Sequence, residues 1–124
     1  MNKIKIYITK DMIEIEGHAK ADVCASISSV MYTAVNIMLQ IDNKSVEYND
    51  TGTLVIIKRL KHSNELDASW DTMIRMFKDA AEMADGEIII QYEEDDNNVS
   101  VWNYLNNSII NCINICNMDI NIYK

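Results

Sequence analysis

No stretch of the chain is apolar over the about 20 consecutive residues that a helix needs to cross a bilayer. The first residues, MNKIKIYITKDM, lack the continuous apolar segment and the small-residue cleavage site of a secretion signal. Hydrophobic residues make up 48% of the chain and charged residues 24%, which is the usage of globular proteins. We therefore expect a soluble, cytoplasmic protein with no membrane partner, and 124 residues leave room for one domain of ordinary size.

Basic residues are in the minority. Eleven lysines and arginines stand against 19 aspartates and glutamates, for a net charge of −8. Because binding to phosphates depends mainly on Lys and Arg, this balance argues against a nucleic-acid partner. It favours encounter with a basic protein instead.

Cysteines are few, and their number, three, is odd, so they cannot all pair within one chain. Without an export signal the reducing cytosol makes free thiols the default, and the question for each cysteine is its reactivity. Cys112 and Cys116 stand four residues apart, but two thiols fall short of the four ligands of a structural zinc site. Packing in a core or an interface is the better interpretation of this pair.

The first half of the chain predicts a hairpin, a helix and two more strands. Apolar residues alternate with polar ones before and after the polar break at residues 9–11, which is typical of a β-hairpin with one buried face. From Val23 to about Gln40 the apolar period changes to three and four, which indicates an amphipathic helix, and Asp22 stands where its N-cap belongs. Residues 45–48 and 53–60 then read as short strands around the turn NDTG.

A second helix is predicted by an apolar stripe from Leu66 to Ala84, with Ser63 or Asn64 capping its start and Asp85-Gly86 its end. The segment EIIIQY, residues 87–92, predicts a last strand, short and apolar as in the centre of a sheet. The order is ββαββαβ, in the α/β class and of α+β type. The economical arrangement packs two helices on one face of a mixed sheet of four or five strands.

The character of the chain changes after Tyr92. The segment EEDDNN is a charged break, and residues 97–124, which include its two asparagines, hold nine asparagines among isoleucines. Residues 102–116 keep a spacing compatible with an amphipathic helix, whereas INIYK alternates like a strand. We therefore divide the chain into a domain over residues 1–93 and an Asn/Ile-rich C-terminal extension over residues 94–124, whose structure the pattern does not decide.

His18 lies six residues before Cys24, at the predicted junction of a strand and a helix. At about the second position of that helix, unpaired N–H groups and the positive end of the helix dipole would stabilise a thiolate. A nearby histidine is the usual activator of a cysteine nucleophile, and the amides of residues 23–25 would be available to an oxyanion. On residue types alone, a small buried cysteine on the inner face of a helix is the commoner interpretation.

The arrangement of two short motifs resembles the ribosomal-processing cysteine protease family called Prp. The motifs are Gly17-His18-Ala19 at the end of a hairpin and Val-Cys-Ala-Ser-Ile-Ser, residues 23–28, at the opening of a helix. The resemblance covers residues 1 to about 93. It implies that His18 and Cys24 form a catalytic dyad, that Ser28 supports the start of the helix, and that the protein is a homodimer that needs no metal or cofactor. The implied substrate is either the N-terminal extension of a bacterial large-subunit ribosomal protein or a phage capsid or scaffold protein.

One departure from the family pattern lies between the dyad residues. The family has a longer, glycine-containing loop before an Asp-Ile-Val-Cys segment, whereas here the loop is AKADV and Asp22 lies one residue nearer the cysteine. A catalytically inactive interaction module is therefore the alternative function. Asp22 could orient His18, although an N-cap explains it with fewer assumptions and a carboxylate so close to Cys24 would oppose thiolate formation. We interpret His62, within KRLKHS, as a solvated loop residue.

Overall fold

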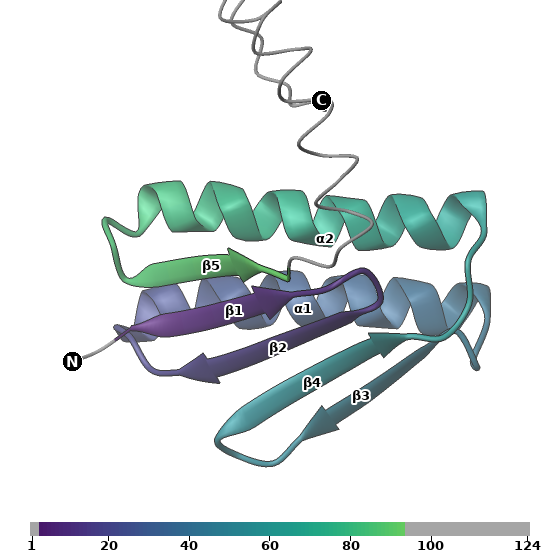
Figure 1. Ribbon diagram of the computed structural model, residues 1–124, viewed down its shortest axis with the longest axis horizontal. Helices are drawn as coiled ribbons and strands as arrows, with labels where there is room; N and C mark the ends of the chain where they lie inside the picture. Colours follow the sequence, from purple (N-terminus) through teal and green to yellow (C-terminus); the bar gives the residue numbers. More distant parts are fainter. Residues whose placement is uncertain (1–2, 94–124) are drawn as a thin grey trace, which may run out of the picture. The chain divides into compact units, whose positions relative to one another are not determined.

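The computed structural model describes residues 3–93, which lie in one compact unit. The elements follow the predicted order ββαββαβ (Figure 1). Their bounds are β1 (Ile4–Ile8), β2 (Met12–Gly17), α1 (Ala21–Ile41), β3 (Val46–Asp50), β4 (Leu54–Arg59), α2 (Asn64–Met83) and β5 (Ile88–Tyr92). The predicted extension over residues 94–124, with Cys112 and Cys116, lies outside the described residues.

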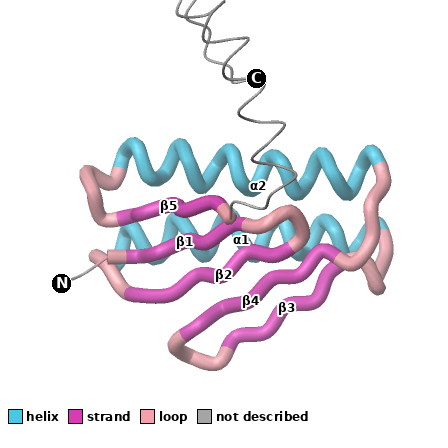
Figure 2. Tube along the Cα trace, in the orientation of Figure 1, coloured by secondary structure: helices cyan, strands magenta, loops and turns pink. Residues whose placement is uncertain are grey.

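The strands form one mixed sheet in the order β3-β4-β2-β1-β5, with β1 and β5 parallel and the other pairs antiparallel. Both helices cover the same face of this sheet (Figure 2), so the predicted fold class is confirmed. The prediction that the last strand is central is wrong for the sheet over residues 3–93, in which β5 pairs with β1 alone and forms an edge. Its apolar residues are explained by the core beneath the helices, against which Ile88 and Ile90 pack.

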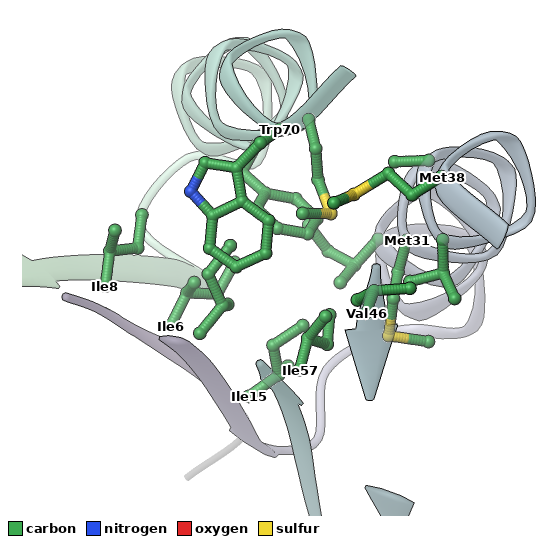
Figure 3. Packing of buried hydrophobic residues seen from close by; sticks show 14 of the residues in the cluster. Ile6, Ile8, Ile15, Met31, Met38, Val46, Ile57 and Trp70 are labelled. Carbon is green, nitrogen blue, oxygen red and sulfur yellow. The ribbon is translucent and has the colours of Figure 1, made fainter. Parts of the chain in front are cut away.

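The core lies between the sheet and the two helices (Figure 3). Alternate residues of β1 and β2 point into it, as the period of two predicted, and each helix contributes one stripe. Trp70 and Phe77 of α2 are 1% and 0% exposed, which confirms their interpretation as core residues. Burial of side chains of this size is worth about 1.5–3 kcal/mol each, so the two stripes hold both helices on the sheet.

Helix α1 is long and apolar enough, by length and composition alone, to cross a membrane. In the structure its apolar stripe packs into the core, and the buried residues are Ile27, Met31, Ala34, Val35 and Met38. A core helix satisfies the same criteria of length and hydropathy, so the length and hydropathy of α1 are not evidence that it crosses a membrane.

Helix α2 begins as predicted, with the Ser63 hydroxyl accepting the Leu66 amide at 3.1 Å. His62 just before it lies in a loop and is exposed, as expected, but its side chain also has two carboxylate partners. Its Nε2 lies 2.9 Å from Asp11 Oδ1 and its Nδ1 lies 3.0 Å from Asp67 Oδ1. The guanidinium of Arg59 reaches the same two carboxylates. Sequence reasoning missed this cluster because the chain brings residues 11 and 62 together only through the sheet.

Candidate active site

The turn after β2 sets the position of His18. Gly17 has a φ of +99°, and a Cβ atom at this position would collide with the carbonyl oxygen of Lys3. That same carbonyl accepts the backbone N–H of His18 at 3.1 Å. Only glycine combines this backbone conformation with so close an approach to β1, so Gly17 places His18 at the end of the sheet.

Helix α1 begins two residues earlier than the sequence indicated. Its N-cap is Lys20, not Asp22, and Lys20 makes no side-chain capping hydrogen bond. Cys24 is therefore the fourth helical residue rather than about the second. Its own amide donates to the Lys20 carbonyl at 3.0 Å, so the expectation that this amide serves an oxyanion is wrong. The segment AKADV leaves only a short loop, because its last three residues, 21–23, already belong to α1.

The helix start still offers hydrogen-bond donors. The amide of Val23 contacts Asp22 Oδ1 at 2.9 Å, whereas the amides of Ala21 and Asp22 have no acceptor among residues 3–93. These two N–H groups belong to the first turn, where the helix has no internal partners for them. They are the donors at this end of the helix that remain for a developing negative charge.

The side chains of His18 and Cys24 lie close together at the first turn of α1. The Cys24 sulfur lies 3.9 Å from His18 Nδ1. The sulfur also lies 3.4 Å from the Ala19 amide nitrogen and 3.5 Å from the Ala19 carbonyl oxygen. The Ala19 N–H can donate to the sulfur, and the Ala19 carbonyl can accept the S–H. The thiol is half-buried and free.

A family model described as cysteine protease Prp matches residues 1–89 of the chain, which include both His18 and Cys24. The chain belongs to the Prp cysteine protease family. No curated protein matches the chain.

Solved structures share its fold, and two of them are of a Prp protease. The essential ribosomal-processing protease Prp from Staphylococcus aureus, in complex with a substrate peptide, superposes with a TM-score of 0.63 at 19% identity, over 75% of this chain and 100% of that one. The same protease with a covalently linked product peptide gives 0.59 at 23% identity with the same coverage. The protein SMU.848 from Streptococcus mutans gives 0.57 at 15% identity, over 74% of this chain and 97% of that chain.

Two of the predicted supporting residues of this Prp-family chain make no hydrogen bond with the His18 and Cys24 side chains among the described residues. The Asp22 carboxylate bonds to the amide of the next residue, and within residues 3–93 no hydrogen bond links it to His18. Ser28 is half-buried one turn further along α1, and the described part of the chain shows no hydrogen bond from its hydroxyl. The structure thus brings together His18, Cys24, Gly17 and Ala19.

A hollow of about 500 Å³ lies beside His18, at the end of the sheet where β2 finishes. The rest of its lining comes from Lys3 just before β1, Lys5 of β1, Glu16 and Gly17 of β2, and Gly52 and Thr53 of the β3–β4 turn. The residues come from three separate segments, so the sequence alone did not reveal the hollow. It provides room for an extended peptide segment next to the imidazole.

Proposed function

We propose that this Prp-family protein is a cysteine endopeptidase in which His18 activates Cys24. The approach of the sulfur to His18 Nδ1, at 3.9 Å, carries this proposal. In the first step His18 takes the thiol proton while the sulfur attacks the carbonyl carbon of the peptide bond. The C–N bond then breaks and His18 returns the proton to the leaving amine. Water, deprotonated by His18, hydrolyses the thioester and regenerates the thiol.

The proposed substrate is the N-terminal extension of a bacterial large-subunit ribosomal protein, processed in the cytoplasm. Support comes from the solved Prp complexes, one with a substrate peptide and one with a linked product peptide, and from the net charge of −8, which suits a basic protein terminus. A phage capsid or scaffold protein is the competing substrate. Incubation of the protein with each precursor and mass measurement of the products distinguishes the two.

A non-catalytic interaction module is the second candidate function. Its support is that the Cys24 amide is already engaged by Lys20 and is not free for an oxyanion. An inactive relative would retain the fold and the half-buried thiol without an activated sulfur. The reactivity of Cys24 therefore separates the two candidates.

Alkylation by iodoacetamide at pH 7 provides this measurement, with the modified cysteine identified by peptide mass. We expect His18→Ala to slow the reaction of Cys24 by about tenfold or more, because the imidazole no longer holds the thiolate. The matched control is His62→Ala, since His62 is the only other histidine and lies in the cluster with Asp11 and Asp67. Equal rates in the two variants would support the module and contradict the protease.

We also propose that the protein acts as a homodimer through the outer surface of its helix pair. A hollow of about 390 Å³ lies between α1 and α2, with Val30, Ile37, Met73 and Met76 among its apolar lining. Ile37 and Met76 are 43% and 46% exposed in the single chain. Large exposed apolar side chains gathered in one groove are typical of a contact surface.

The substitution Ile37→Glu is expected to shift the molecular mass in solution from that of a dimer to that of a monomer, because it places a charge in the apolar groove. Light scattering coupled to size-exclusion chromatography measures this mass. Asn36→Glu adds the same charge at the neighbouring exposed position of α1 and should leave the dimer intact. A monomeric wild-type protein would contradict the proposal.

A further inference from the structure

Glu87 reaches the short loop between His18 and Cys24 from the other end of the described chain. Its backbone is held on both sides, since its carbonyl accepts the Ile4 amide at 2.8 Å and its amide donates to Ala84 at 3.1 Å. The side chain is 21% exposed. Its Oε1 accepts the backbone N–H of Lys20 at 3.4 Å, and its Oε2 lies 3.5 Å from Lys20 Nζ. A fixed strand end therefore presents a carboxylate to the loop.

The contact with the Lys20 backbone is the important one. The Lys20 ammonium group is on a side chain that is 74% exposed, and an ion pair in such a setting is worth little. The backbone of Lys20, in contrast, lies in the loop that joins His18 to Cys24, and its contacts reach Cys24. Its carbonyl accepts the Cys24 amide at 3.0 Å, and the residue before it, Ala19, contacts the Cys24 sulfur through its amide.

Lys20 also lacks the support that a helix N-cap commonly supplies itself. As the N-cap of α1 it makes no side-chain hydrogen bond to the first turn. The Glu87 carboxylate instead holds the N-cap residue from outside the helix, at the positive end of the helix dipole. Lys20 makes no capping hydrogen bond with its own side chain, and Glu87, the residue before β5, accepts its backbone N–H instead.

We propose that Glu87 is a positioning residue: it fixes the position of Lys20, and through Lys20 the position of the Cys24 sulfur relative to His18. This inference rests on the proposed protease function. A displacement of about 1 Å in a reacting group can cost about 10²-fold in rate, so one hydrogen bond at this loop is enough to affect turnover. Glu87 touches neither His18 nor Cys24 and acts only through the loop.

Two substitutions at Lys20 isolate the hydrogen bond. Lys20 has a φ of −58°, which a proline ring accepts, so Lys20→Pro removes the N–H that Glu87 binds. Lys20→Ala removes the same side chain but keeps the N–H. We expect Lys20→Pro to lower kcat about 10- to 100-fold with KM changed by less than about twofold, and Lys20→Ala to stay within about twofold of wild type.

Substitutions at Glu87 provide the complementary pair. Glu87→Ala should match Lys20→Pro, whereas Glu87→Gln keeps an oxygen acceptor and should retain most of the activity. Glu82→Ala, which removes an exposed carboxylate of α2, is the control for charge. The second readout is iodoacetamide alkylation of Cys24, which needs no substrate. We expect it to slow about five- to tenfold in Lys20→Pro and Glu87→Ala, whereas mere loosening of the fold would expose the thiol and speed it.

The outcomes separate this inference from the proposed function. If His18→Ala and wild type alkylate at the same rate, the protease proposal fails and the positioning role fails with it. If those two differ but Lys20→Pro equals Lys20→Ala in alkylation and in kcat, the role of Glu87 alone is overturned. Loss in Glu87→Gln as large as in Glu87→Ala also overturns it, because the hydrogen-bond acceptor would then not be the property that matters.

Discussion

Replacement of Cys24 by alanine or by serine is expected to abolish cleavage of a peptide that spans the processing site, with a fall of at least about 10⁴-fold in kcat. Alanine removes the nucleophile. Serine retains a similar shape but carries a hydroxyl that ionises far less readily than a thiol. The contacts of residue 24 with His18 and Ala19, at 3.4–3.9 Å, also have the length expected for a sulfur atom. Product formation is measured by mass spectrometry after incubation with the precursor peptide.

The controls for this experiment are a folding check and a second cysteine. Circular dichroism should show that both Cys24 variants retain the fold, because the side chain is only half-buried and the substitutions are small. Cys112→Ala should leave cleavage intact, since Cys112 lies outside the segment that the Prp family model matches. Cleavage by the Cys24 variants at the wild-type rate would eliminate the proposed mechanism.

The second large effect is expected at Gly17. Gly17→Ala should lower the free energy of unfolding by roughly 3 kcal/mol or more, because it combines an unfavourable left-handed conformation with a collision against the Lys3 carbonyl. Urea denaturation followed by circular dichroism measures the change. The collision can be relieved only by moving the ends of β1 and β2 apart, which would displace His18 and lower kcat as well.

Gly52→Ala is the matched substitution. Gly52 has a φ of +93°, close to that of Gly17, but a Cβ atom there would meet no atom within 4 Å. It should therefore show the conformational cost alone, about 1 kcal/mol. An equal loss of stability in the two variants would mean that the contact between Gly17 and Lys3 contributes nothing.

Local patterns in the sequence were enough for most of the fold. The period of two in β1 and β2, the period of three and four in α1 and α2, and the Ser63 cap are set by neighbouring residues, so their positions could be predicted within a few residues. The resemblance to Prp depended on the two short motifs around His18 and Cys24, and the family match confirmed it. The N-cap of α1 was placed two residues late because Asp22 is a better cap by residue type than Lys20.

Apart from the N-cap of α1, the features that the sequence did not reveal depend on partners far along the chain. The edge position of β5, the cluster around His62 and the contact of Glu87 with Lys20 join residues separated by up to 84 positions. Such contacts follow from strand pairing and not from local periodicity. The sequence by itself determined the elements, the core stripes and the pair His18 and Cys24. Only the tertiary structure decided how that pair is held, because the supports of its short loop come from the starts of β1 and β5.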